Sequence, residues 1–183
     1  EPDITIESLN PNTGTFILGD SCEPKDTMGI LSRCRDSRLE IIQKLKMKNP
    51  TSTIHTLGEG ADISDLNASE IELYKGTLRN RDLLKRALSE LEKEESNHES
   101  IGQLLSDHHQ VLRDVLQVST PKIEAMMDAA SNAGALGGKI NGSGGGGCMF
   151  AYAPNNPEHV AEAIEKAGGK TYIIQQDEGT RIN

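Results

Sequence analysis

A run of glycines at residues 142–147, Gly-Ser-Gly-Gly-Gly-Gly, holds the residue types that most clearly indicate chemistry. Backbone without Cβ atoms can adopt positive φ and lets a ligand come close to its amide groups. Several N–H groups gathered in such a loop suit an anion such as a phosphate. The candidate binding residues are therefore Gly142, Ser143, Gly144, Gly145, Gly146 and Gly147. The Ser143 hydroxyl could add a donor there or only cap the turn.

Two familiar nucleotide-binding patterns fit this run in part and fail on context. The dinucleotide pattern needs a helix after its glycines, but the apolar, strand-like Cys148-Met149-Phe150 follows. The P-loop pattern needs Lys and Ser or Thr where Cys148 and Met149 stand. A flexible linker is the plain alternative for a glycine run. Strand-like segments on both sides favour a loop fixed within a sheet.

No side chain is assigned as a catalytic base or a metal ligand. Asp20, Asp36 and Asp114 are the carboxylates that could be nominated as a general base, but acids at turns and helix starts usually cap or remain solvated. His108 and His109 are neighbours on an expected helix and point about 100° apart, so they cannot bind one metal together. We expect the histidines to serve in helix packing.

Other polar residues near these segments are expected to be structural. Arg113 and Asp114 precede Pro121 and are expected to tie down that turn by a charge-assisted hydrogen bond. Lys139 is expected to be a solvated lysine at a strand end rather than a group facing the loop.

Charge and cysteine content exclude several classes of function. The net charge of −9, with basic and acidic residues interspersed, offers no footprint for nucleic acid or for an anionic membrane. No stretch approaches the roughly 20 apolar residues of a membrane span. Cys22, Cys34 and Cys148 lack the spacing of a zinc site or a disulfide framework. A cytoplasmic protein is expected.

Hydrophobic periodicity and punctuation predict an α+β chain. A hairpin of strands 4–7 and 15–20 opens it, and a long connection, 47–66, separates the first two helices. Asn67 with Glu70 and Ser96 with Glu99 are expected to cap two helices that pack as a helical hairpin, with Leu84, Ala87, Leu88 and Leu91 on one face of the first. Thr120 is expected to cap the next helix, with Pro121 at its first position. The remaining expected elements are helices at 27–46, from about 68, from about 97, at 121–134 and 157–167, with strands at 138–141, 148–153 and 171–175.

The segment 138–148, Gly-Lys-Ile-Asn-Gly-Ser-Gly-Gly-Gly-Gly-Cys, resembles the third conserved motif of the GHMP kinase superfamily. In that family the motif is a glycine loop beside the transferring phosphate and the sugar. Further matches follow the order found in the galactokinases of this superfamily. They are Gly-Gln-Leu-Leu at 102–105 with His108 or His109, Leu-Arg-Asp at 112–114 and Val-Ser-Thr-Pro-Lys-Ile-Glu at 118–124, with weaker matches at 16–21, 32–35 and 80–87.

The resemblance implies the C-terminal half of an ATP-dependent sugar kinase. It implies a ferredoxin-like antiparallel sheet layered with helices over residues 31–183, while residues 1–30 would be strands left from an N-terminal kinase domain. The glycine loop 142–147 would line the phosphate and sugar cleft. ATP and a monosaccharide would be the ligands and the N-terminal kinase domain the partner. The catalytic base and the Mg ligands would lie in that preceding half, so this piece alone would be inactive.

The start of the chain and one departure from the family pattern bear on this interpretation. The chain begins Glu1-Pro2-Asp3 and runs at once into an expected strand, which favours a truncated or processed product. Galactokinases usually have a sugar-contacting Tyr ahead of an Arg pair, but Ile30-Leu31-Ser32 precedes Arg33 here. Two alternatives stay open: a non-catalytic sugar-binding or regulatory module, and a kinase for another small alcohol such as a mevalonate or heptose derivative.

Overall fold

The computed structural model describes residues 9, 11–25, 27–50, 56–58, 60–177 and 179. Helices and strands follow one another in an α+β order, which confirms the predicted class. The elements are β1 (Thr15–Asp20), α1 (Thr27–Lys48), α2 (Ala68–Leu91), α3 (His98–Asp114), α4 (Pro121–Asn132), β2 (Gly137–Ile140), β3 (Cys148–Tyr152), α5 (Pro157–Lys166) and β4 (Lys170–Gln175). The predicted strand at 4–7 lies outside the described residues.

One four-stranded antiparallel sheet, in the order β2-β3-β1-β4, forms the centre of the fold. The strand β1 pairs with β3 on one edge and with β4 on the other, so that Ile17 lies opposite both Ala151 and Ile173. Its partners therefore come from the C-terminal part of the chain. Although residues 1–30 were expected to belong with a preceding domain, this pairing places β1 inside the sheet.

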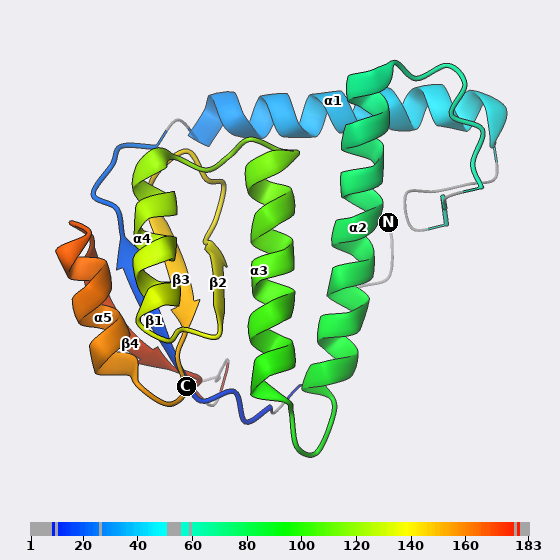
Figure 1. Ribbon diagram of the computed structural model, residues 1–183. Coiled ribbons are helices and arrows are strands. Elements are labelled where there is room, and N and C mark those ends of the chain that lie inside the picture. The colour runs from blue at the N-terminus through cyan, green and yellow to red at the C-terminus, as the bar shows by residue number, and fades with distance from the viewer. Residues whose placement is uncertain are drawn as a thin grey trace, which may run out of the picture.

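The main core lies between this sheet and the helices α4 and α5, which cover one face (Figure 1). Alternate residues of β1 point into that core, and Ile17 is completely buried there. The sequence predicts a buried stripe of Ile123, Met126, Met127 and Ala130 on α4; three of these are buried and Met127 is partly buried. Thr120 caps this helix by accepting the Ile123 N–H, and Pro121 occupies the first turn, as predicted.

The helices α2 and α3 form the predicted helical hairpin, with α3 beside the β2 edge of the sheet (Figure 1). The predicted buried face of α2 is wrong in part, because Leu84 is 60% exposed and Leu88 is 39% exposed. The buried stripe of α2 instead passes through Tyr74, Leu78 and Leu83. Tyr74 and Leu78 pack in one hydrophobic cluster, and Leu83 packs in another, with Ala87 partly buried against it. The prediction used only the apolar residues of the last turns and therefore missed this stripe.

Side-chain caps fix both ends of this hairpin. Asn67 and Glu70 form a reciprocal capping box at the start of α2, as predicted. The cap of α3 is Asn97, which accepts the Ser100 N–H, so the predicted cap Ser96 is wrong by one residue. The acid that accepts the Asn97 N–H is Glu90 of the preceding helix, rather than a residue of α3 itself.

A second hydrophobic cluster joins α1, α2 and the connection between them. Its buried members include Leu45 from α1, Leu57 and Leu66 from the connection, and Tyr74 from α2. The described part of the connection thus packs against α1 and α2, and residues 51–55 and 59 lie outside it. Within the described residues no helix is both long enough and apolar enough to cross a membrane.

Candidate functional site: the glycine loop

The loop 142–147 joins β2 to β3 and is fixed in the sheet at its base. The Asn141 N–H donates to the Cys148 carbonyl at 2.9 Å, which continues the ladder one residue beyond the strand. The glycines at 142, 144, 145, 146 and 147 all have positive φ, between 69° and 104°. L-residues rarely adopt this conformation, so the glycines are required by the backbone path itself. The loop is therefore a defined turn, as its flanking strands predicted.

Two neighbouring segments hold the loop from outside the hairpin. The Ser21 N–H donates to the Gly147 carbonyl at 2.9 Å, and the Gly145 N–H donates to the Val118 carbonyl at 2.7 Å. Gly144 and Gly146 are buried beneath these contacts. The Gly145 N–H is thus engaged within the protein. Among the described residues, the N–H groups of Gly146 and Gly147 donate to no backbone carbonyl.

The space around the loop excludes side chains at several positions. A Cβ at Gly144 would overlap the Val118 carbonyl oxygen, and one at Gly145 would overlap the end of the Ile30 side chain. A Cβ at Gly146 would lie 2.9 Å from the Pro24 carbonyl oxygen. The close packing is therefore backbone against backbone at Gly144 and Gly146. Of these three neighbours, only the Ile30 side chain at Gly145 could move away easily.

Lys25 is a positively charged residue beside this loop that no sequence pattern singled out. Its side chain lies where a Cβ of Gly147 would be, and its Nζ would be 3.2 Å from a Cβ at Gly142. The positive charge also reaches Cys148, although burial is the dominant effect there and raises the pKa of that thiol. Cys148 therefore stays protonated at neutral pH. Lys25 is distant from the glycine run along the chain, so no local pattern could have connected them.

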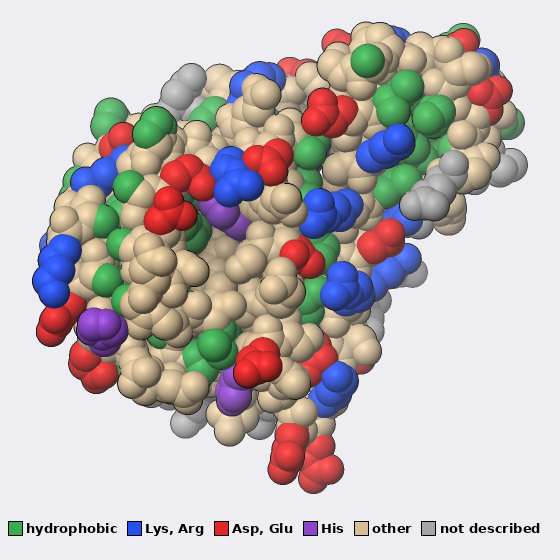
Figure 2. Space-filling view, in the orientation of Figure 1, with side chains coloured by type: hydrophobic (Ala, Val, Ile, Leu, Met, Phe, Trp, Pro, Cys, Tyr) green, Lys and Arg blue, Asp and Glu red, His purple; other side chains and the backbone are tan. Residues whose placement is uncertain are grey.

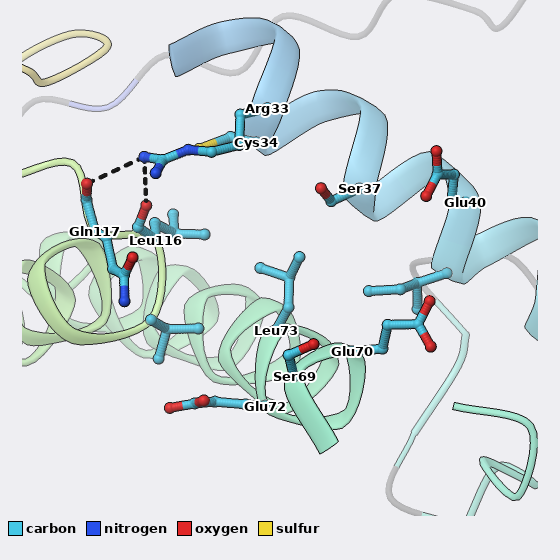
Figure 3. Close-up of a pocket in the computed structure, with 12 residues that line it drawn as sticks. Arg33, Cys34, Ser37, Glu40, Ser69, Glu70, Glu72, Leu73, Leu116 and Gln117 are labelled. Carbon is cyan, nitrogen blue, oxygen red and sulfur yellow. Dashed lines mark hydrogen bonds between the residues drawn. The ribbon is translucent and has the colours of Figure 1, made fainter. Parts of the chain in front are cut away.

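The turn at residues 116–120 connects the loop to the helices. Arg33 of α1 donates through one guanidinium nitrogen to the carbonyls of Leu116 and Gln117, both at 3.1 Å (Figure 3). Gln117 has a φ of 51°, a strained value for a residue with a side chain. The next carbonyl, that of Val118, receives the Gly145 N–H. Arg33 thus clamps a turn that in turn holds the glycine loop.

A cavity of about 310 Å³ opens beside this turn, between α1 and the first turns of α2. Ser37 and Glu40 line it from α1, while Ser69 and Glu72 line it from α2 (Figure 3). Glu70 also reaches this cavity but is engaged by the Lys44 ammonium at 2.5 Å. The charged groups of the lining other than Arg33 are three carboxylates, those of Glu40, Glu70 and Glu72, which does not suit a phosphate.

The other residues singled out from the sequence lie away from the loop. His109 is buried and its Nε2 lies 3.0 Å from Glu124 Oε1. His108 lines an apolar groove between α2, α3 and the sheet, where burial lowers its pKa to about 4. Lys139 is not solvated as predicted: it is largely enclosed, donates to the Ile140 carbonyl at 2.7 Å and lies over the Phe150 ring. Burial lowers the pKa of Lys139 accordingly.

The acidic residues act as the sequence suggested. Asp20 accepts the Cys22 N–H in a turn, and Asp36 pairs with its neighbour Arg35. Asp114 is held by Arg113 through two nitrogens, at 2.7 and 3.2 Å, and the pKa of its carboxyl is lowered by that hydrogen bond. In all three cases the contacts of the carboxylate are with its own neighbours along the chain and not with the glycine loop.

Charges of both signs are mixed over the face seen in Figure 2, with a hollow between α3 and α4 rimmed by acidic and basic side chains. This hollow, of about 190 Å³, is lined in part by Arg113, Glu124 and Asp128. Across the described ranges, no group of three or more His, Cys, Asp or Glu residues is placed to hold a metal ion. The three cysteines are all unpaired.

Comparison with known proteins identifies the family. The profile described as GHMP kinases C terminal matches residues 80–172, which include the whole glycine loop. The chain belongs to the GHMP kinase C-terminal family. The resemblance recognised in the sequence is therefore confirmed, and so is the fold class.

Individual members of the GHMP kinases show how far the similarity reaches. A mevalonate kinase of Thermococcus gammatolerans is 49% identical over 96 residues, covering 52% of this chain and 28% of that protein. A galactokinase of Clostridium perfringens is 32% identical over 138 residues, covering 67% of this chain and 35% of that protein. The crystal structure of Lactococcus lactis galactokinase complexed with galactose superposes with a TM-score of 0.78 at 17% identity, over 91% of this chain and 45% of that one.

The chain thus spans about a third of the length of these curated relatives and less than half of the solved structure. Because the sequence identity to the solved structure is only 17%, the superposition shows that the two chains share a fold and nothing more. The two relatives differ in the alcohol that their names give, so the family membership leaves the acceptor open.

Proposed function

We propose that this chain is the C-terminal half of an ATP-dependent kinase that transfers the γ-phosphate of ATP to the hydroxyl of a small alcohol. The chain would then follow a preceding N-terminal kinase domain and form the C-terminal domain, with β1 as one strand of its sheet. The loop 142–147 would line the cleft for the phosphate and the acceptor, opposite the preceding half.

One observation carries the proposal: the glycine loop is held in one conformation by its own strands and by two other segments. Gly145 is fixed by Val118, and Gly147 is fixed by Ser21. A flexible linker would not be pinned at both places, so the plain alternative for a glycine run loses its support. A rigid loop can present N–H groups to a phosphoryl group without reorganising them during the reaction.

The loop can contribute electrostatic stabilisation rather than covalent chemistry. Phosphoryl transfer is accelerated mainly by positioning and by neutralising the charge that spreads over the transferred group. Within the loop only the Gly145 N–H donates to a described backbone carbonyl, so the other loop N–H groups and the ammonium of Lys25 are the donors of this chain that could serve that task. The Ser143 hydroxyl would be an additional donor, since its one contact, to the Gly144 carbonyl, is long at 3.5 Å.

ATP and Mg are the cofactors that this activity would use, with Mg supplying charge neutralisation at the phosphates. The described residues of this chain offer no cluster of ligands for the metal. By the resemblance to the GHMP kinases, the Mg ligands and the catalytic base would lie in the preceding half.

The acceptor is proposed first as a monosaccharide, because the similarity to a galactokinase extends over two thirds of the chain. Mevalonate is the second candidate, since the mevalonate kinase relative is more similar, at 49% identity, over a shorter stretch. A non-catalytic module that binds the same sugar is the rival from another functional class.

The test is ADP release by the full-length protein that contains this chain, assayed with Mg-ATP and either galactose, other aldohexoses or mevalonate. Mass spectrometry of the product identifies which alcohol gains a phosphate. Turnover with a sugar supports the first acceptor, and turnover with mevalonate alone moves the assignment to the second. Sugar binding by calorimetry without ADP release would refute the kinase and favour the non-catalytic module.

A further inference from the structure

His109 of α3 stands at the start of a chain of polar contacts that ends at the glycine loop. This side chain is only 6% exposed, and its Nε2 lies 3.0 Å from Glu124 Oε1 of α4. Its Nδ1 is buried and has no partner among the described residues. Burial is the main reason that the pKa of His109 is lowered, and the charges of Arg113 and Lys139 add to that effect against Glu124. The neutral ring therefore donates its Nε2–H to Glu124.

Glu124 passes this constraint on to the turn at 116–120. The same oxygen that accepts from His109 also accepts a short hydrogen bond from the Ser119 hydroxyl. Its other oxygen lies 3.4 Å from a guanidinium nitrogen of Arg113. The carboxylate is thus held from three sides, and it fixes Ser119 at the beginning of α4.

Ser119 adjoins the residue that contacts the loop. Val118 is 4% exposed, its N–H donates to the Leu112 carbonyl at 3.0 Å, and its carbonyl accepts the Gly145 N–H at 2.7 Å. This carbonyl also lies against Gly144, where it leaves no room for a Cβ. A small rotation of the peptide at Val118 would therefore displace both glycines.

We infer that His109, acting through Glu124 and Ser119, is a positioning residue that sets the conformation of the glycine loop for phosphoryl transfer. The inference rests on the proposed function for its catalytic consequence, but the structural linkage stands by itself. Apolar packing already joins α3 and α4 to the core through Val111, Ile123 and Met126. Burying a histidine and a carboxylate beside them costs desolvation, which their hydrogen bonds must offset. Apolar packing alone would not connect α3 to the turn at 116–120, whereas His109 and Glu124 do so by hydrogen bonds.

The first test measures hydrogen exchange of the full-length protein by mass spectrometry, on peptides that cover the loop. Ser119→Ala removes the hydroxyl that links Glu124 to the turn. We expect amide exchange in 142–147 to rise roughly five- to tenfold, as expected for one lost hydrogen bond, while α3 and α4 keep their protection. Ser89→Ala, an exposed serine on α2, is the matched control and should leave loop exchange unchanged.

The second test separates positioning from general stability by steady-state kinetics. His109→Gln keeps an N–H donor at the place of Nε2, whereas His109→Leu removes it. We expect His109→Leu and Ser119→Ala to lower kcat roughly tenfold, with KM for ATP within about twofold, because small displacements of reacting groups are costly. His109→Gln should restore most of kcat.

The outcomes distinguish this inference from the proposed function. If the unmodified protein turns over no alcohol, the proposed function fails, and loop exchange still decides the linkage. Equal exchange in the loop of Ser119→Ala and of Ser89→Ala would overturn the linkage. Faster loop exchange with an unchanged kcat would overturn the positioning role.

Discussion

Replacing Gly144 by alanine tests whether the loop is held by backbone contact. Gly144 has a φ of 82°, and a Cβ there would overlap the Val118 carbonyl oxygen and lie 2.7 Å from Val118 Cβ. The positive φ alone costs a residue with a side chain about 1–2 kcal/mol. Since the neighbour is backbone, the turn or the loop must also move, which adds about 1–3 kcal/mol. The total of about 2–5 kcal/mol is large against the stability of one domain.

Gly134→Ala is the matched control for the backbone term. Gly134 follows α4 with a φ of 98°, is exposed, and has nothing within 4 Å of an added Cβ. It therefore carries the φ cost without the overlap. We expect Gly134→Ala to lower the Tm of the full-length protein by about 2–4 °C, with kcat unchanged.

Differential scanning calorimetry and ADP-release kinetics on both variants complete this test. We expect Gly144→Ala to lower the Tm by at least about twice as much as Gly134→Ala, and to lower kcat at least about tenfold at temperatures where the protein is folded. Equal Tm and kcat in the two variants would refute the view that Val118 and the loop are in fixed contact.

Three further predictions concern neighbouring groups. Lys25→Met should lower kcat by about tenfold by removing a charge beside the loop, whereas Lys85→Met on α2 should not, as ADP release will show. Arg33→Met should lower the Tm by about 2 °C and increase hydrogen exchange at 116–119, because two carbonyls lose a charged donor. Burial, with Lys139 and His109 nearby, lowers the pKa of His108 to about 4, below the roughly 6.5 of an unfolded histidine. The stability that the neutral His108 ring contributes is therefore present above pH 6.5 and is lost on acidification toward pH 4. Between about pH 7 and pH 5 the loss of stability is about 1 kcal/mol once solvent screening of the half-buried ring is allowed for. The fall in Tm over that pH range should therefore be smaller in His108→Leu than in the unmodified protein, and an equal fall in both would contradict this role of His108.

Local signals in the sequence predicted the elements well. Thr120 and Pro121 marked the start of α4, and Asn67 with Glu70 marked the start of α2, because caps act within one turn of the chain. The turn at the glycine loop was also predictable, because the ability of glycine to adopt positive φ depends on the residue itself and not on distant contacts.

Features that depend on tertiary contacts could not be predicted in this way. The sheet pairs β1 with two strands from the far end of the chain, so the sequence could not exclude a partner for β1 in another domain. Lys25 reaches the loop only through the packing of residues 21–25 against it. Lys139 has the sequence context of a solvated strand end, but its position opposite Phe150 places its ammonium over that ring, where it also donates to the Ile140 carbonyl.

The most direct test of the central claim is hydrogen exchange of the full-length protein with and without a non-hydrolysable Mg-ATP analogue. We predict that the analogue slows amide exchange in peptides covering 142–147, where only the Gly145 N–H donates to a described backbone carbonyl. Protection elsewhere in the protein, with exchange in 142–147 unchanged at a saturating concentration of the analogue, would contradict this claim.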